Sequence, residues 1–278
     1  MSVELRGLRS DMPVGFMAGL GLLRVLPSHA RLSWSATTQT AVIHGLDRGE
    51  LLATLLQHMT GRSKSPELHI EADVRGVASE RFRELVETQT SDTLQWVRAL
   101  WWEKGEEVIP TSLCFTSGPQ RMILMAQRLA AALDPSGSTK AKERVQAKFE
   151  EALFGPWLYA DDTPSWGWDP ASYRIGAQTH QAPTVMPNEG VSAAYWLAWE
   201  ALPLLPCVPG RGTLGFLKEN RVTKWTWASW SEPLPLAAVE ALLRRPKEAV
   251  SLGGRMFESD VVKSGYYQFF RPARFRTN

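Results

Sequence analysis

The amino-acid sequence predicts an α+β protein, with helices packed against a single mixed or antiparallel sheet in one domain of residues 1–278. Its 278 residues are 44% hydrophobic and 22% charged, which is enough apolar material for a sizeable core. Stretches with the period of a helix alternate irregularly with short stretches that have the period of a strand. No repeat of roughly 20 to 50 residues is visible, so the pattern does not indicate a solenoid or a propeller.

The first expected elements are a strand and a glycine-bearing helix. Residues Val3–Leu8 alternate between apolar and polar side chains, as a strand does. Ser10 and Asp11 then offer a cap for a helix. Pro13 suits its first turn, and Pro27 ends it. Three glycines inside this helix cost about 1 kcal/mol each relative to Ala, so we expect it to pack closely against a neighbour in the core.

The remaining elements follow from periodicity and from the residues that interrupt it. Helices are expected where apolar residues recur three and four positions apart, and strands where β-branched and aromatic residues alternate with polar ones. The expected helices are Leu51–Met59, Ser79–Val86, Asp92–Trp102, Pro119–Leu133, Ala141–Leu153, Ser192–Leu202 and Pro235–Leu243, and the expected strands are Arg31–Trp34, Ala41–Ile43, Thr213–Leu217, Val222–Ala228 and Val261–Phe269.

Two stretches are expected to lack regular structure. Ser136–Lys142 is small, polar and charged, which favours a flexible loop. Gly155–Pro187 is rich in Pro, Gly, Trp and Asp without a sustained period, which indicates an ordered but irregular layer. The helix that follows this layer is expected to place Trp196, Trp199 and their apolar neighbours Leu197 and Leu202 in the core.

Cysteine usage and hydropathy indicate a cytoplasmic protein. Cys114 and Cys207 are the only cysteines, so neither a disulfide framework nor a Cys-x-x-Cys metal pair is expected. The most apolar stretch, Met12–Leu26, is shorter than the roughly 20 residues that span a bilayer, and it contains Arg24. We therefore expect no membrane partner.

Signatures of enzymes and cofactor sites are weak. Residues 210–215 spell Gly-x-Gly-x-x-Gly, but a dinucleotide site needs a strand before this string and a helix after it, whereas prolines precede it here. The five histidines show no metal-ligand spacing. A nucleophile at Cys207 with His180 as its base is conceivable, although a Cys between prolines is more typical of inert packing. We expect neither a cofactor nor a metal.

Positive charge gathers in a basic C-terminal portion, residues 211–278. This portion carries 12 Lys and Arg against 6 Asp and Glu, a net charge of +6, whereas residues 1–210 carry 19 against 23, a net charge of −4. Lys and Arg neutralise phosphates, and aromatic rings stack on bases. The candidate nucleic-acid-binding residues are Arg211, Arg221, Lys224, Arg255, Lys263, Arg271, Arg274 and Arg276, with the rings of Trp225, Trp227, Tyr266, Tyr267, Phe269 and Phe270 between them.

The same segment also has a purely structural interpretation. Trp225, Trp227 and Phe269 would then be core residues of a sheet, and the arginines would form a solvated rim. Charged faces and aromatic strands are common in α+β proteins, so the pattern alone leaves both interpretations open.

Several strings, taken in order, resemble a known family. The N-terminal LRGLRSDMPVGFMAGLGLLRVL is similar to the opening of proteins encoded with type I-G (formerly I-U) CRISPR systems. The later strings FTSGPQRMILMAQRLAAAL, FGPWLY, WDPASYR, WLAWEALPLLPCVP and KSGYYQFFRPAR resemble the same family in the same order, so the resemblance spans nearly the whole chain. The group is described as an extension of the CRISPR helicase-nuclease, with large-subunit-like proteins of these systems as relatives.

The resemblance implies a non-catalytic subunit of a crRNA-guided DNA interference complex. The partners that it implies are the other effector subunits, the helicase-nuclease, and crRNA, target DNA or both. The phosphate loop of the helicase and the His-Asp pair of the nuclease are both missing from this sequence. One alternative is a protein adaptor that recruits the helicase-nuclease without touching nucleic acid. Another is a metal-dependent enzyme that uses the acidic loop 161–180, with Asp161, Asp162, Asp169 and His180.

Overall fold

The structure is a computed structural model that describes residues 1–115, 121–163, 166–172, 189–208, 212–264 and 267–276. The predicted α+β class is confirmed, with 44% helix and 24% strand. The helices are α1 (Pro13–Val25), α2 (Arg48–Met59), α3 (Ser79–Thr88), α4 (Ser91–Leu100), α5 (Met122–Ala132), α6 (Thr139–Phe154), α7 (Ser192–Glu200) and α8 (Leu236–Arg244). The strands are β1 (Ser2–Arg9), β2 (Arg31–Trp34), β3 (Thr40–His44), β4 (Trp101–Lys104), β5 (Glu107–Pro110), β6 (Asp161–Asp162), β7 (Glu189–Gly190), β8 (Cys207–Val208), β9 (Gly212–Thr213), β10 (Phe216–Glu219), β11 (Val222–Ala228), β12 (Met256–Ser264), β13 (Tyr267–Phe270) and β14 (Arg274–Phe275).

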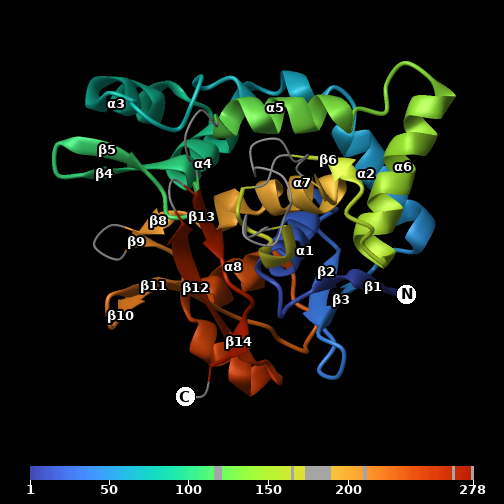
Figure 1. Cartoon of the computed structure of the whole chain (residues 1–278). Helices are drawn as coiled ribbons and strands as arrows, with labels where there is room; N and C mark the ends of the chain where they lie inside the picture. The colour runs from blue at the N-terminus through green and yellow to red at the C-terminus, as the bar shows by residue number, and fades with distance from the viewer. Residues whose placement is uncertain (116–120, 164–165, 173–188, 209–211, 265–266, 277–278) are drawn as a thin grey trace, which may run out of the picture.

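The strands are divided among several small antiparallel sheets rather than gathered into one. A three-stranded sheet has the order β1-β3-β2, and a five-stranded sheet has the order β10-β11-β12-β13 with β14 also paired to β12. The pairs β4-β5, β6-β7 and β8-β9 form separate ribbons. Figure 1 shows α5, α6 and α2 above, α1 and α7 in the centre, and the five-stranded sheet below and to the left.

Helices α1 and α7 form the centre of the core. Every residue of α7 is buried, and α1 is buried from Pro13 to Leu23. The two helices pack directly on each other, and Gly21 makes this possible because an added Cβ would overlap the Leu197 carbonyl oxygen. The close packing expected of the N-terminal helix is confirmed, as is the burial of Trp196, Leu197, Trp199 and Leu202.

The segment 230–234 joins the two larger sheets. Leu32 and Leu234 exchange backbone hydrogen bonds of 2.9 and 3.0 Å, and the Trp34 amide donates to the Trp230 carbonyl at 2.8 Å. The Trp230 indole N–H also donates to the Leu32 carbonyl at 2.8 Å. The outer edge of β2 is therefore occupied by a segment that leads from β11 to α8.

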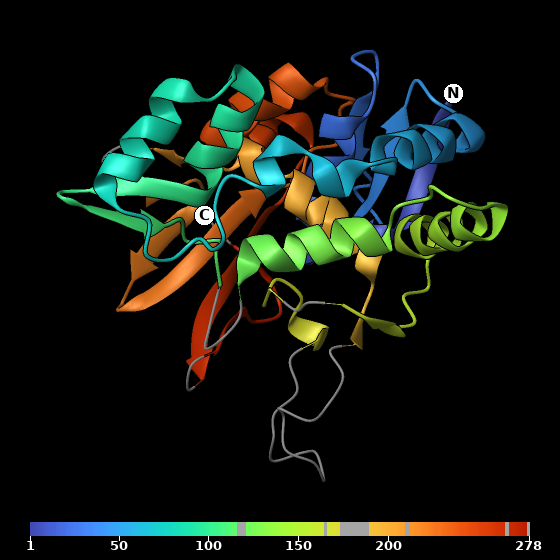
Figure 2. The same ribbon diagram turned by 90° about the horizontal axis from the view of Figure 1, so that it is seen from above.

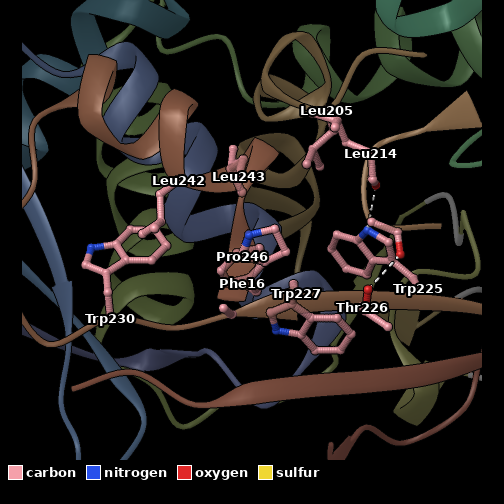
Figure 3. Close-up of a pocket in the computed structure, with 12 residues that line it drawn as sticks. Phe16, Leu205, Leu214, Trp225, Thr226, Trp227, Trp230, Leu242, Leu243 and Pro246 are labelled. Carbon is pink, nitrogen blue, oxygen red and sulfur yellow. Dashed lines mark hydrogen bonds between the residues drawn. The ribbon is translucent and has the colours of Figure 1, made fainter. Parts of the chain in front are cut away.

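Aromatic rings fill the space between α1 and the five-stranded sheet (Figure 3). The Phe16 ring lies 5.6 Å from Trp34, 6.0 Å from Trp225, 5.9 Å from Trp227 and 6.3 Å from Trp230, measured between ring centroids. The cavity among these side chains has a volume of only about 10 Å³. That is room for one water at most, so this cluster is core packing and not a ligand site.

Four expected elements differ from the structure. The expected strand Thr213–Leu217 is interrupted by a turn at residues 214–215, so that Thr213 pairs with β8 and β10 pairs with β11. The Trp101–Trp102 pair begins β4 instead of ending α4, and it forms a hairpin with β5 that was not expected. The expected strand Val261–Phe269 is divided between β12 and β13, which pair with each other in antiparallel fashion. Helix α6 begins inside the expected loop, because Ser138 caps it by accepting the Ala141 amide at 3.1 Å. Pro119, the expected start of the α5 helix, lies outside the described residues.

Viewed from above, α5 crosses the molecule and leads toward α6 (Figure 2). Within the described residues, none of the helices combines the length and the apolar character that a membrane span requires.

Candidate nucleic-acid interface

The β10-β11 hairpin presents Arg221 at its tip. Glu219 pairs with Val222 across the strands, which leaves Asn220 and Arg221 as a two-residue turn. Both have positive φ, 49° and 67° respectively, which is the geometry of the tight turns that suit the twist of a hairpin. Asn is well suited to its position, but Gly is preferred where Arg221 stands. An exposed arginine is thus held in a conformation that the side chain itself disfavours.

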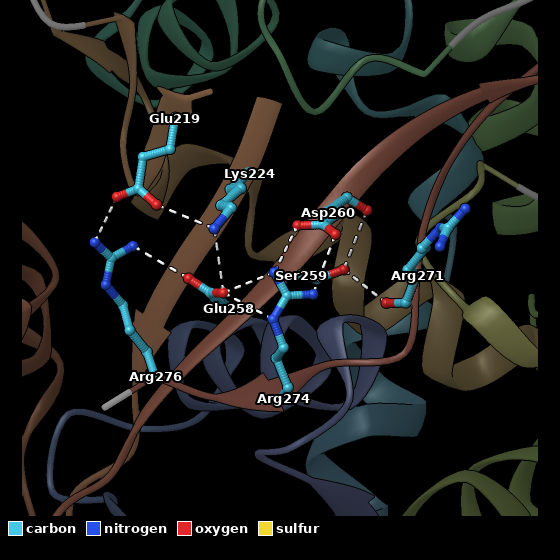
Figure 4. Close-up of polar contacts among 8 residues, drawn as sticks. All are labelled: Glu219, Lys224, Glu258, Ser259, Asp260, Arg271, Arg274 and Arg276. Atoms are coloured by element: carbon cyan, nitrogen blue, oxygen red, sulfur yellow. Dashed lines mark hydrogen bonds and ion pairs between the residues drawn. The ribbon is translucent and has the colours of Figure 1, made fainter. Parts of the chain in front are cut away.

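Three of the other predicted cations are engaged by carboxylates of the same sheet (Figure 4). Lys224 Nζ lies 3.0 Å from Glu219 and 3.3 Å from Glu258. Arg274 contacts Glu258 at 2.7 Å and Asp260 at 3.0 Å. Arg276 contacts two of the same carboxylates: one of its terminal nitrogens lies 2.7 Å from Glu219, and the other lies 3.3 Å from Glu258. This cluster, which we call the sheet network, holds three cations and three anions.

The ion pairs of the sheet network favour its charged forms. The Arg274 guanidinium hydrogen-bonds to Asp260 and holds the pKa of that carboxyl below its ordinary value. The Lys224 ammonium does the same for Glu219, with help from Arg276, and its own pKa is raised in return. Because the charges cancel within the network, these cations contribute little net positive field to the surface.

Three further predicted cations line an open groove beside this sheet. One wall is the segment 110–115, and the other is formed by β10 to β13 and the residues next to them; the volume is about 800 Å³. Arg221, Lys263 and Arg271 line this sheet groove, and none of them has an ion pair within the described part of the chain. Asp260 also lines it, but both of its oxygens accept from Arg274, at 3.0 and 3.1 Å.

The backbone of Arg271 is fixed although its side chain is exposed. Its amide donates to the Asp260 carbonyl at 2.9 Å, and its carbonyl accepts the Ser259 hydroxyl at 2.6 Å. Figure 4 shows its guanidinium extending away from the sheet network. The groove therefore has one cation at a hairpin tip, one near the end of β12 and one directly after β13, and cations placed apart in this way can contact more than one phosphate.

The two remaining predicted cations are placed differently. Arg255 lies over the exposed Phe275 ring, with 5.4 Å from its guanidinium carbon to the ring centroid, and does not line the groove. Arg211 lies outside the described residues, as does Tyr266. The eight predicted residues thus fall into a paired group, a groove-lining group and these two.

The rings expected to stack on bases are core residues where the structure describes them. Trp225 is 1% exposed, Trp227 2%, Phe269 8% and Phe270 0%. Trp225 and Trp227 stack on each other with centroids 4.7 Å apart, and Trp225 also stacks on Phe270 at 5.3 Å. The structural interpretation of Trp225, Trp227 and Phe269 is therefore correct, and Phe270 is buried with them; burial excludes base stacking on all four rings.

The acidic loop does not gather into a metal site in the part of the chain that is described. Asp161 pairs with Lys148 and accepts the Ser192 amide at 3.0 Å at the start of α7. Burial opposes its ionisation, but these hydrogen bonds outweigh burial and lower its pKa. Asp169 accepts the Ala171 amide at 2.9 Å, and burial raises its pKa. His180 lies outside the described residues.

Neither cysteine has the environment of a nucleophile. Burial raises the pKa of the Cys114 thiol to about 12 and that of the Cys207 thiol to about 11. A thiol that stays protonated at neutral pH is a poor nucleophile. His180, the base considered for Cys207, lies outside the described residues.

A buried charge cluster was not predicted. Glu200, at the end of α7, is 0% exposed and is contacted by Arg24 at 2.7 Å, His58 at 2.8 Å and Arg62 at 2.9 Å. Burial opposes its ionisation, but the hydrogen bond from His58 and the charges of the two arginines outweigh it and lower its pKa to about 2. Arg62 also pairs with Glu67.

The sequence carried a signal for this cluster. Glu200 is the only charged residue of α7, and Arg24 is the only charged residue of α1. A lone charge in an otherwise apolar helix is expected to have a buried partner of opposite charge. Since each of its oxygens is already contacted by cations, Glu200 serves to join α1, α2 and α7 and is not free for chemistry.

Comparison with known proteins does not extend this picture. No protein-family model matches the chain, and no curated protein matches it at a significant level.

Proposed function

We propose that this chain is a non-catalytic subunit of a type I-G CRISPR interference complex, and that its sheet groove holds the backbone of crRNA or target DNA. The family resemblance supports the first half of the proposal. The observation that carries the second half is that Arg221, Lys263 and Arg271 line one groove without an ion pair among the described residues. Lys224, Arg274 and Arg276, by contrast, are neutralised by the carboxylates of the sheet network.

This arrangement favours binding without sequence preference. Contacts from Lys and Arg to phosphates position a nucleic acid but do not read its bases. Of the rings predicted to stack on bases, Trp225, Trp227, Phe269 and Phe270 are buried in the core. Affinity should therefore fall steeply as the salt concentration rises. The logarithm of the binding constant should decrease linearly with the logarithm of the salt concentration, by about 0.9 per phosphate contact for duplex DNA and about 0.7 for a single strand.

A matched pair of triple variants tests the proposal. The groove variant combines Arg221→Gly, Lys263→Ala and Arg271→Ala, and the control variant combines Arg244→Ala, Arg245→Ala and Lys247→Ala. Both remove three positive charges from the C-terminal portion, but the control residues are exposed on α8 and the turn after it, away from the groove. Arg221→Gly also relieves the positive φ at the hairpin tip, so lost binding would not reflect a weakened hairpin.

The measurement is fluorescence anisotropy of labelled single-stranded RNA, single-stranded DNA and duplex DNA over a salt titration. The groove variant should bind more weakly, with a salt slope lower by about 2 to 3, while the control keeps the slope of the parent. Equal losses in both variants would mean diffuse binding to a basic surface. Unchanged binding by the groove variant would remove the sheet groove as the site.

The adaptor alternative predicts a different result. If the parent binds none of the three nucleic acids at low salt but co-purifies with the helicase-nuclease, the chain acts through protein contacts alone.

A further inference from the structure

A second groove lies on another part of the surface, between α5, α6 and β6. Its volume is about 900 Å³, and it is lined by the outward side of α5, by Arg144 and Lys148 of α6, and by residues 160–162. It shares no residue with the sheet groove, and nothing in the proposed function requires it.

Helix α5 has two different long faces. Its inner face is buried and includes Met122, Ile123 and Ala126. Along the outer side, Arg121, the N-cap residue directly before α5, and Arg128 are exposed, and Leu124 and Met125 between them are only half-buried. Residues at positions i, i+3, i+4 and i+7 share one side of a helix, so the two arginines stand about 10 Å apart, at either end of an apolar patch.

Among the described residues that line this groove, positive and negative charges do not balance. Lys148 is occupied by Asp161, so the acidic residue that stays exposed is Asp162. Arg144 contributes a hydrogen bond of 3.5 Å to the Ala132 carbonyl at the end of α5, which keeps its guanidinium beside the groove. Together with Arg121 and Arg128 at the two ends of the apolar patch, the groove presents a net positive rim around an apolar floor.

We propose that this α5–α6 groove is a docking site for an acidic amphipathic helix of a partner protein. A helix laid in a groove contacts it through residues spaced three, four and seven apart. A partner with acidic residues seven positions apart and Leu-type residues between them would match Arg121, Leu124, Met125 and Arg128 in both spacing and charge. Methionine adapts its shape easily and is common on surfaces that bind such helices.

The floor of the groove favours a peptide over a nucleic acid. A phosphate backbone would cover the half-buried Leu124 and Met125 without offering them an apolar partner, so it would gain nothing from these side chains. Phosphates also follow one another at a fixed spacing, so a strand that crossed the groove would meet Asp162. A helix can place a neutral or basic residue opposite that carboxylate.

Two synthetic peptides test the proposal on the full chain. The acidic probe is a stapled helix of roughly four turns with Glu at i and i+7 and Leu at i+3 and i+4, and the basic probe has Lys in place of both Glu. In this test the groove variant is Arg121→Glu with Arg128→Glu in the α5–α6 groove, and it is distinct from the triple variant of the sheet groove described above. The control variant is Lys140→Glu with Lys142→Glu, which reverses two exposed charges near the start of α6 outside this groove.

Binding is measured by anisotropy at about 50 mM salt, where charge contacts are strong. The acidic probe should bind the parent and the control variant, and bind the groove variant at least about tenfold more weakly. The basic probe should show the opposite preference and bind the groove variant more tightly than the parent. A variant whose fold was damaged would not gain affinity for the basic probe.

Three outcomes would overturn the proposal. The acidic probe could fail to bind the parent, or it could bind the parent and the groove variant equally. A labelled oligonucleotide could also lose affinity for the groove variant while the acidic probe does not, which would assign the groove to nucleic acid. Binding of the acidic probe by the sheet-groove triple variant separates this test from that of the proposed function.

Discussion

Replacing Glu200 by Gln should destabilise the protein by about 3 to 5 kcal/mol, because it leaves buried cations without their counter-charge. Gln keeps the size of the side chain but removes its negative charge and turns an N–H₂ group toward Arg24, His58 and Arg62. The fully buried carboxyl has a pKa of about 2 instead of 4.5. At about 1.4 kcal/mol per pH unit, this difference corresponds to about 3 kcal/mol in favour of the ionised, folded form.

The pH dependence has a definite sign. The pKa of Glu200 is lower in the folded chain than in the unfolded one, so its contribution is fully present above pH 4.5 and is lost as the pH falls toward 2. The difference in stability between the parent and Glu200→Gln should therefore be constant at neutral pH and shrink below pH 4.5. Other acidic groups titrate in the same range, but they do so in both proteins and cancel in the difference.

The assay is urea unfolding followed by Trp fluorescence. The stacked pair Trp96 and Trp199, with centroids 5.3 Å apart, lies on elements that meet beside the cluster and should report its loss. Glu143→Gln is the control, since Glu143 is exposed on α6. A midpoint for Glu200→Gln equal to that of the parent, or a stability gap that does not change between pH 4.5 and pH 2, would refute this reasoning.

Three further predictions concern the core. Gly21→Ala should lower the free energy of unfolding by about 3 kcal/mol or more, since the new methyl group would overlap a backbone carbonyl of α7; thermal melting followed by circular dichroism measures this. Cys114 and Cys207 should both react slowly with a thiol reagent at neutral pH and promptly after denaturation, because burial raises the pKa of each thiol; two reactive thiols in the native protein would contradict this. Trp227→Phe removes the 2.7 Å hydrogen bond from the indole to the Ser10 carbonyl and should cost about 1 to 3 kcal/mol in urea unfolding, with no pH dependence.

Much of the fold was predictable because strong local signals agreed with the packing. Pro13 and Pro27 bound a helix that ends at Val25, and β2 was predicted with the bounds that the structure has. The β4-β5 hairpin was missed because Trp101 and Trp102 extend the apolar period of α4, and two residues do not distinguish a helical period from that of a strand. The division into small sheets depends on contacts between segments that are far apart in the sequence. Hydrophobic periodicity reports only local structure, so it does not predict these contacts.

The candidate site was predictable only in part, because charge balance is set by strand register. The sequence shows a basic C-terminal portion, but Lys224 stands opposite Asp260, and Glu258 stands opposite Arg274, only when β11, β12 and β14 pair as they do. That pairing neutralises three predicted cations and leaves Arg221 at a turn. The burial of the aromatic rings likewise follows from which side of the sheet faces α1.

The segment 230–234, which covers the outer edge of β2, has a consequence for how the chain is made. Trp230 lies 198 positions after Leu32, to which it donates its indole hydrogen bond. At roughly 5 to 20 residues per second, a ribosome supplies that partner about 10 to 40 seconds after β2. During this interval the N-terminal sheet has an unpaired edge next to the Trp34 side chain, and such edges template aggregation. The nascent chain should therefore depend on chaperones until residue 234 has emerged, and slower translation should increase its loss to aggregates.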